Sequence, residues 1–258
     1  MATTLSSLFD ITDKVALITG ASGGLGQAAA KGLAQFGAKV MLTGRDHAKL
    51  DPVRAAIQAN AGIAACVAGN PDDPADVQRI VATTVQQFGG IDILITAAGM
   101  NKPKPIVEQA LADWQAVMDA NVKATYLACH EVGKVMLAQK RGGKVILVSS
   151  TRGKLGMANY SAYCPSKGAI DSLTQALACE WGPAGINVNA IAPTVFRTAL
   201  TQWMFDDQAV YKKFLARIPI GRLAEPEDFT GALVFLSSRA SDFITGAILY
   251  LDGGYTAG

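Results

Sequence analysis

Hydrophobic residues gather in seven short runs along the chain, and the stretches between them repeat apolar residues every three to four positions. Most runs carry consecutive apolar residues, which is typical of parallel strands covered on both faces. The intervening periodicity predicts amphipathic helices. Repeated strand–helix–strand units predict an α/β fold, a doubly wound parallel sheet of about seven strands with helices on both faces. The runs lie at 14–20, 39–44, 64–69, 92–99, 144–150, 186–193 and 247–254.

The stretch TVFRTALTQWMFDDQAVYKKFLARIPI, roughly 194–220, departs from this rhythm. Its many large apolar side chains predict a helical flap rather than a strand connection. The sequence contains no linker, low-complexity tract or internal repeat, and α/β folds of 258 residues are often single domains. Residues 1–258 are therefore predicted to form one domain.

Composition narrows the function classes. Half of the residues are hydrophobic, which fits either an alanine-rich core or apolar surface buried between subunits. The net charge of +2 without a basic cluster argues against nucleic acid as the main partner. The chain has no apolar run of about 18 residues, so no membrane span is expected. Its N-terminus lacks the pattern of a secretory signal.

Cysteine and histidine usage points to a cytoplasmic protein without a metal centre. The four cysteines are scattered with no CxxC pair, so we expect reduced thiols. His47 and His130 are the only histidines, and no cluster of metal ligands is evident in the sequence. We therefore expect no metal site built by the protein.

The sequence TGASGGLG, residues 19–26, follows the first strand and opens a helix. Its glycines allow a tight turn, so that free amides at the helix N-terminus can face a pyrophosphate. Similar turns also occur for packing reasons alone. As a dinucleotide site, the turn would contribute Gly20, Ser22, Gly24, Leu25 and Gly26.

Tyr163 and Lys167 are four residues apart, so both would project from one face of a helix. Bringing a phenol from a pKa of about 10 toward 7 takes about 4 kcal/mol of phenolate stabilisation, part of which a nearby ammonium would supply. Pro165 lies between them, and a proline costs about 3 kcal/mol in a helix interior but little in the first turn. The sequence therefore predicts a helix that begins just before Tyr163, with Ser161 as its cap.

Several motifs lie in order from Lys14 to Gly254: GxxxGxG in the glycine turn, Asp92, Asn121, Ser150, YxxxK at 163–167, NAIAPTVFRT at 189–198, and the tail GRLAEPED…FLSS…TG…DGG. This set resembles the short-chain dehydrogenase/reductase family. The resemblance implies a Rossmann-type fold and hydride transfer between a nicotinamide cofactor and a carbonyl or secondary alcohol.

The resemblance also implies roles for four residues. Tyr163 would be the general acid/base, and Ser150, at the carboxyl end of the fifth strand, would hydrogen-bond the substrate oxygen. Lys167 would hold the nicotinamide ribose and tune Tyr163, and Asn121 would hold a water in a proton relay. Each has a structural alternative: a core tyrosine, a solvated lysine, or an asparagine at a helix kink.

Further cofactor contacts are implied at the ends of the strands, by Asn70 at the adenine, by Ala98 and Gly99 through close approach, and by Pro193, Val195 and Thr198 near the carboxamide.

The chain departs from the family pattern in two places. The family's NNAG is TAAG here, which puts Thr96 in place of an asparagine that ties the central strands together. The PG after the sixth strand is PT at 193–194.

The sequence TGRD at 43–46 bears on the choice of cofactor. Gly44 stands where NAD binders usually carry an acidic residue, and the guanidinium of Arg45 could hold a 2′-phosphate, which favours NADP. Two features leave NAD open: Gly23 stands where many NADP-binding relatives have a second basic residue, and Asp46 could pair with Arg45.

The substrate is less defined. The flap and residues 155–160 would form a mostly apolar lid, while Arg152, Lys154 and Arg197 could meet a carboxylate or phosphate. The opening sequence is similar to gluconate 5-dehydrogenase-like members, so a small carbonyl or polyol is favoured over a 3-oxoacyl thioester. A regulatory protein that senses the dinucleotide without catalysis is the alternative function. Segments 226–238 and 247–254 correspond to assembly surfaces of the family, which implies a homotetramer, with a dimer second.

Overall fold

The computed structural model describes residues 5–198 and 201–258, and its seven strands form one parallel sheet in the order β3-β2-β1-β4-β5-β6-β7. Each strand lies within one of the predicted runs, except that β5 begins one residue earlier. The predicted doubly wound sheet is therefore confirmed. The strands are β1 (Val15–Thr19), β2 (Lys39–Gly44), β3 (Ala64–Ala68), β4 (Ile93–Thr96), β5 (Gly143–Val148), β6 (Ile186–Pro193) and β7 (Ile248–Leu251).

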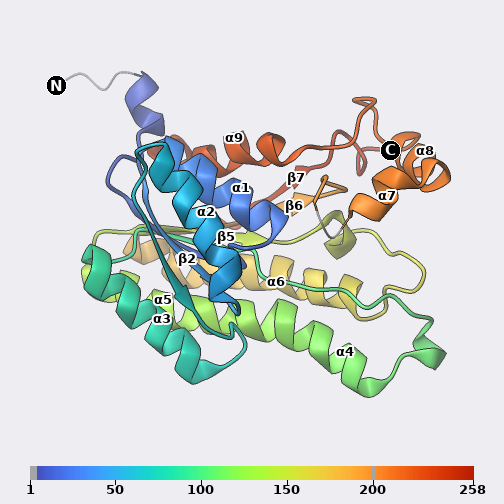
Figure 1. Ribbon diagram of the computed structural model, residues 1–258, viewed down its shortest axis with the longest axis horizontal. Helices are drawn as coiled ribbons and strands as arrows, with labels where there is room; N and C mark the ends of the chain where they lie inside the picture. Colours follow the sequence, from blue (N-terminus) through green and yellow to red (C-terminus); the bar gives the residue numbers. More distant parts are fainter. Residues whose placement is uncertain (1–4, 199–200) are drawn as a thin grey trace.

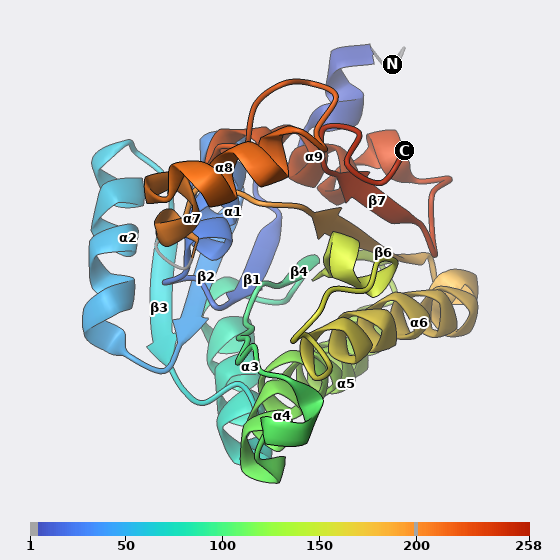
Figure 2. The same ribbon diagram turned by 90° about the vertical axis from the view of Figure 1, so that its right-hand side faces the viewer.

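Helices cover both faces of the sheet (Figures 1 and 2). One face carries α1 (Gly24–Gln35), α2 (His47–Ala59) and α9 (Pro226–Ser237). The other carries α3 (Pro74–Phe88), α5 (Ala124–Gln139) and α6 (Tyr163–Trp181), with α4 (Leu111–Met118) leading into α5. The short helices are η1 (Leu5–Phe9), η2 (Ile106–Glu108), η3 (Asp119–Lys123), η4 (Thr151–Gly153), η5 (Gly182–Ala184) and η6 (Arg239–Ser241).

Two hydrophobic cores explain why the strands are apolar throughout. Ile18 of β1 packs with Leu33 of α1 in one core, and its neighbour Leu17 packs with Ile170 of α6 in the other. Successive strand residues point to opposite faces, so both must be apolar. Burying each such side chain contributes about 1.5–3 kcal/mol.

The strand order reverses between β1 and β4, because β2 and β3 lie on one side of β1 while β4 to β7 lie on the other. Open α/β sheets bind ligands outside the carboxyl ends of the strands at such a point. Thr19 and Thr96, the last residues of β1 and β4, are register partners there. The fold therefore brings the glycine turn after β1 next to the loop after β4.

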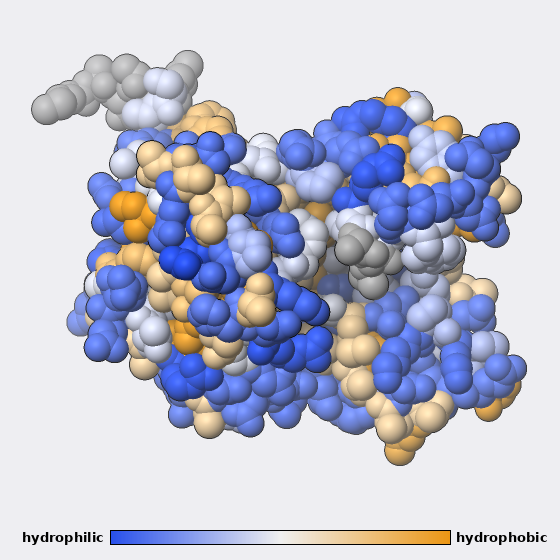
Figure 3. All heavy atoms as spheres, in the orientation of Figure 1, coloured by the Kyte–Doolittle hydropathy of each residue, from blue (hydrophilic) through white to orange (hydrophobic). Residues whose placement is uncertain are grey.

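Residues 201–215 of the predicted flap form α7 (Gln202–Asp206) and α8 (Gln208–Leu215), which confirms its helical character; residues 199 and 200 lie outside the described residues. Met204, Phe205 and Phe214 pack with Tyr255 near the C-terminus in a third, smaller core. In the space-filling view, the molecular surface is hollowed between the segment that contains α7 and α8 and the helices below it (Figure 3). Among the described residues, no helix is both long enough and apolar enough to span a membrane.

Candidate active site

The glycine turn between β1 and α1 has the geometry of an anion site. Gly20 adopts φ +67°, and a Cβ added there would lie 2.6 Å from the Ala98 backbone nitrogen, so only glycine lets the turn pass the end of β4. A Cβ at Gly26 would collide with the Gly20 carbonyl. α1 begins at Gly24 without a side-chain cap. Its first amides are therefore free for a negatively charged group, and the turn fits a dinucleotide pyrophosphate.

Arg45 directly follows β2, at the carboxyl edge of the sheet. Arg45 is exposed, and within residues 5–198 and 201–258 it forms no ion pair. Asp46 does not pair with it; the Asp46 carboxylate caps α2 by accepting a hydrogen bond from the Ala48 amide at 3.0 Å. Asn70 is exposed just after β3, and its backbone amide donates to Asp76. The Arg45 guanidinium is thus available to a phosphate.

Helix α6 begins at Tyr163, which puts Pro165 in its first turn and confirms the predicted helix start. The expected cap was wrong. Ala162 occupies the cap position without a side-chain bond, and the Ser161 hydroxyl donates to Gln109 Oε1 at 3.1 Å. The first turn of α6 needs no side-chain cap. The amides of Cys164 and Ser166 donate instead to the backbone carbonyls of Tyr160 and Ala162.

Lys167 lies one turn into α6 and is only 5% exposed. Its Nζ donates to the Val148 carbonyl at the end of β5 at 2.9 Å and lies 5.6 Å from the centroid of the Tyr163 ring. Burial lowers the pKa of Lys167 to about 8, and the charge of Asp171, one further turn along, opposes that shift. Asp171 was not singled out from the sequence, although its i+4 spacing from Lys167 was readable there.

The phenol of Tyr163 is less acidic than expected. Burial raises the pKa of Tyr163 to about 12, against a hydrogen bond from Ser150 and the charge of Arg152, which lower it. Lys167 directs its ammonium to the Val148 carbonyl. The protein's own groups therefore do not make this phenol acidic, because desolvation of the phenolate outweighs the nearby charges.

Ser150 follows β5 and faces Tyr163, as its position at the strand end predicts. Its hydroxyl accepts a hydrogen bond from the Arg152 amide at 3.1 Å and donates to the Pro193 carbonyl at 3.5 Å. The neighbouring Ser149 hydroxyl instead donates to the Lys167 carbonyl at 3.4 Å. Of the two serines, Ser150 is the one whose hydroxyl lies beside the phenol.

Asn121 lies in a π-helical turn, η3, that joins α4 to α5. It is 1% exposed. Its Oδ1 accepts from the Met100 amide at 2.8 Å, and its Nδ2 donates to the Met100 carbonyl and to Ser166 Oγ. A Cβ at Gly99 would lie 2.9 Å from Asn121 Oδ1 and 3.8 Å from Lys167 Nζ. Gly99, Asn121 and Lys167 therefore meet at one point, and π turns of this kind are frequent at functional sites.

A cavity of about 190 Å³ joins Ser150, Tyr163 and Val195. It is also lined by Asn101, which lies in an irregular loop with no motif to mark it, and by Thr194, which the sequence marked only as a departure from the family pattern. Thr198, predicted at the carboxamide, lies against Gly24, where an added Cβ would collide with it. A larger hollow of about 740 Å³ at the opposite edge of the sheet is lined by Asp92 and Lys144 and contains none of the predicted site residues.

The three candidate anion-binding residues, Arg152, Lys154 and Arg197, differ in their position relative to the cavity. Lys154 is exposed and lies 5.2 Å from the centroid of the Tyr250 ring. Arg197 pairs with Glu225 at 3.1 Å on the surface. Arg152 alone of the three lines the cavity.

Thr96, which replaces the asparagine of the family pattern, has a hydroxyl without a hydrogen-bond partner among the described residues. Thr96 is buried at the end of β4, and its Oγ1 makes no hydrogen bond to any described residue. The same holds for Thr43 of β2, while Thr19 between them accepts a long bond from the Ala98 amide. Thr96 therefore does not tie the central strands together as an asparagine would.

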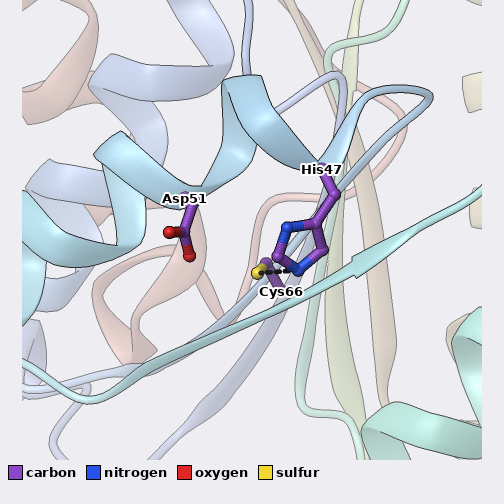
Figure 4. A group of neighbouring side chains, drawn as sticks. All are labelled: His47, Asp51 and Cys66. Atoms are coloured by element: carbon purple, nitrogen blue, oxygen red, sulfur yellow. Dashed lines mark hydrogen bonds between the residues drawn. The ribbon is translucent and has the colours of Figure 1, made fainter.

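The fold also brings together a group of possible metal ligands that are far apart in the sequence (Figure 4). His47 and Asp51 lie one turn apart on α2 and face Cys66 of β3, and their ligand atoms lie within 4.8 Å of one another. The Cys66 thiol contacts His47 Nε2 at 3.3 Å, and the Asp51 carboxylate is held by Arg54 at 2.6 Å. These side chains already satisfy one another, and the guanidinium opposes a cation, so we assign no metal to them.

Comparison with known proteins agrees with this architecture. A family model described as enoyl-(acyl carrier protein) reductase matches residues 20–256. The chain is 52% identical over 256 residues to an uncharacterised oxidoreductase of Mycobacterium tuberculosis, covering 96% of this chain and 93% of the relative. It is 36% identical over 249 residues to gluconate 5-dehydrogenase of Gluconobacter oxydans, covering 96% and 97%.

A solved structure shares the fold closely. It is a gluconate 5-dehydrogenase from Burkholderia cenocepacia in complex with NADP and tartrate, and it matches with a TM-score of 0.94 and 30% identity over 98% of both chains. Family match, fold and glycine turn agree over nearly the whole chain. The chain therefore belongs to the short-chain dehydrogenase/reductase family and is an NAD(P)-dependent oxidoreductase that acts on a small molecule.

Proposed function

We propose that this protein is an NADP(H)-preferring dehydrogenase/reductase of a small carbonyl or secondary alcohol, with Tyr163 as its general acid/base. The observation that carries the proposal is the convergence of Ser150 and Tyr163 on one cavity, with Lys167 behind the Tyr163 ring. This cavity lies at the carboxyl edge of the sheet, where Ser150 follows β5 and Thr194 follows β6. A protein that only sensed the dinucleotide would need the turn but not this group of side chains.

Each residue has a defined task in the proposed reaction. The bound dinucleotide supplies or accepts a hydride at C4 of its nicotinamide and, when oxidised, adds a positive charge to the site. Ser150 donates a hydrogen bond to the substrate oxygen and holds it beside Tyr163. Tyr163 gives a proton to that oxygen in reduction and takes it in oxidation. Lys167 stabilises the phenolate and binds the ribose hydroxyls, and Asn121 orders the path by which the proton reaches solvent.

Turnover with a matched variant tests this assignment. Consumption of NADPH, followed by absorbance over a panel of small ketones, is expected with wild type and is expected to fall at least 100-fold with Tyr163→Phe. NADPH binding, followed by fluorescence, should be equal in the two proteins. Equal NADPH binding with no turnover in either protein would favour a dinucleotide sensor.

The preference for NADP is supported by Arg45, whose guanidinium is exposed at the end of β2 and not paired with Asp46. Gly44 adds no acidic side chain that would repel a 2′-phosphate. The four free cysteines fit a cytoplasmic location, which we include in the proposal.

We also propose a homotetramer. β7 is an edge strand whose apolar residues Ile248–Leu251 are all only partly buried, and nearby Phe243 is fully exposed. An apolar groove also follows α5 and α6, where it is lined by Tyr126 and Leu173. Exposed apolar edges of this kind are usually covered by another chain. Light scattering should give about four times the 26.9 kDa of one chain, and a mass near 27 kDa would contradict the proposal.

A further inference from the structure

Arg152 brings a positive charge into the cavity around Ser150 and Tyr163. It lies on η4, directly after β5, and only 8% of the residue is exposed. Its Nη2 donates to the Tyr255 hydroxyl at 2.7 Å, and its Nη1 donates to the Gly156 carbonyl at 3.4 Å. Both acceptors are neutral, so neither bond balances the charge of the guanidinium.

Charge balance distinguishes Arg152 from most other arginines. No carboxylate within the described part of the chain pairs with Arg152, and no aspartate or glutamate lines the cavity. A second guanidinium, Arg217, lies 4.3 Å from the centroid of the Tyr255 ring, but it is exposed and does not line the cavity. The arginines that do form ion pairs are Arg54, Arg79, Arg141, Arg197, Arg222 and Arg239. A buried charge without a counter-charge is costly, and an anionic ligand would supply the missing partner.

Two further polar atoms of the cavity also lack partners among the described residues. Asn101 Oδ1 and Thr194 Oγ1 are buried, line the cavity region, and make no hydrogen bond. The first can only accept a hydrogen bond, and the second can donate or accept, so hydroxyl groups on a ligand would satisfy both. The volume of about 190 Å³ is below the roughly 300–1,000 Å³ of sites for drug-sized ligands, which restricts the ligand to a small molecule.

We propose that Arg152 binds the carboxylate of a small polyhydroxy or oxo acid, and that Asn101 and Thr194 bind hydroxyl groups of the same molecule. This inference rests on the proposed function, because the acid is the substrate of Ser150 and Tyr163. Two of the five N–H donors of Arg152 are in use, which leaves three for a carboxylate in the planar geometry that a guanidinium prefers. A neutral polyol or a 3-oxoacyl thioester would leave the charge unbalanced.

Three ligands with one carbon skeleton test the role of charge. Gluconate, its neutral amide gluconamide, and the alditol glucitol are titrated by calorimetry into the NADP-loaded enzyme, beside wild type, Arg152→Met and Arg217→Met. Wild type should bind gluconate at least 10-fold more tightly than either neutral compound. Arg152→Met should reduce that ratio to about 1. Arg217→Met should keep it, because Arg217 is exposed and does not line the cavity.

The outcomes separate this inference from the proposed function. Wild type that bound gluconamide or glucitol as tightly as gluconate would overturn the role of Arg152. The same holds for wild type that showed no saturable binding of gluconate. Both results are independent of whether Arg152→Met folds. Stronger binding of gluconate 6-phosphate than of gluconate would replace the carboxylate by a phosphate and also overturn it. Tyr163→Phe should retain the gluconate preference while losing turnover. A Tyr163→Phe enzyme that still turned over would refute the proposed function and leave the Arg152 result intact.

Discussion

Substituting Lys167 by methionine should change how the stability of the protein depends on pH. Burial lowers the pKa of Lys167 to about 8 from its ordinary value of 10.5. The unfolded chain therefore holds this proton between about pH 8 and 10.5, while the folded chain releases it. Stability rises with pH wherever the unfolded state binds more protons, so Lys167 destabilises the fold most below pH 8 and less as the pH rises toward 10.5.

The size of this effect follows from the two pKa values. A shift of one pKa unit corresponds to about 1.4 kcal/mol, so protonated Lys167 destabilises the fold by roughly 3 kcal/mol at pH 7. At pH 10 nearly all folded chains and about a quarter of the unfolded chains have lost the proton, and about 1 kcal/mol remains. Wild type should therefore gain roughly 2 kcal/mol relative to Lys167→Met between pH 7 and pH 10.

Urea unfolding of both proteins at pH 7, 8, 9 and 10, at one protomer concentration and without added dinucleotide, measures this gain. The upper limit avoids the titration of Tyr163, whose pKa is raised to about 12 in the folded protein. Lys134→Met, which removes an ammonium on the exposed side of α5, is the control for loss of a lysine. A stability difference between wild type and Lys167→Met that stays constant from pH 7 to 10 would refute a buried, destabilising ammonium.

Three further substitutions test other parts of the structure. Thr96→Val should raise the free energy of unfolding by about 1 kcal/mol, because it removes a buried hydroxyl without a partner; a loss of stability in thermal melts would show that the hydroxyl is bonded. Arg45→Ala should raise the KM for NADPH about 10- to 100-fold and leave that for NADH unchanged; equal effects on both would contradict a phosphate contact. Tyr126→Glu should reduce the mass of the assembly in light scattering, and an unchanged mass would exclude the α5–α6 groove as an interface.

The sheet was predictable from the sequence because both cores require apolar residues on both faces of each strand. Adjacent residues such as Leu17 and Ile18 are both apolar because they face different cores. Each strand therefore appears in the sequence as one of the seven apolar runs. Pro165 also located the start of α6, because a proline costs little in the first turn of a helix and about 3 kcal/mol in its interior. The cap at Ser161 was wrong because α6 begins at Tyr163, so that Ala162 occupies the cap position. The Ser161 hydroxyl instead donates to Gln109 Oε1, and no local pattern reports a partner 52 residues away.

The chemistry of the site was less predictable than its position. The spacing of Tyr163 and Lys167 placed both residues but not the direction of the ammonium, which depends on the Val148 carbonyl at the end of a strand from another part of the chain. Burial is likewise a property of the whole fold, so the sign of the pKa shift at Tyr163 could not be read from spacing. The sequence did not distinguish Arg152 from Lys154 and Arg197, and only the fold shows that Arg152 is buried.

The raised pKa of Tyr163 determines how the proposed acid/base step must work. Moving that pKa from about 12 to near 8 requires roughly 5 kcal/mol of additional phenolate stabilisation. One unit charge at about 5.6 Å, the distance from Lys167 Nζ to the ring centroid, contributes about 3 kcal/mol at an effective dielectric constant near 20. One cation is therefore insufficient, whereas two at such a distance would supply about 6 kcal/mol. Acidity at Tyr163 should thus need Lys167 together with the charge of an oxidised nicotinamide. In the proposed mechanism, proton transfer is therefore coupled to cofactor binding, because the protein's own groups keep the phenol protonated at neutral pH.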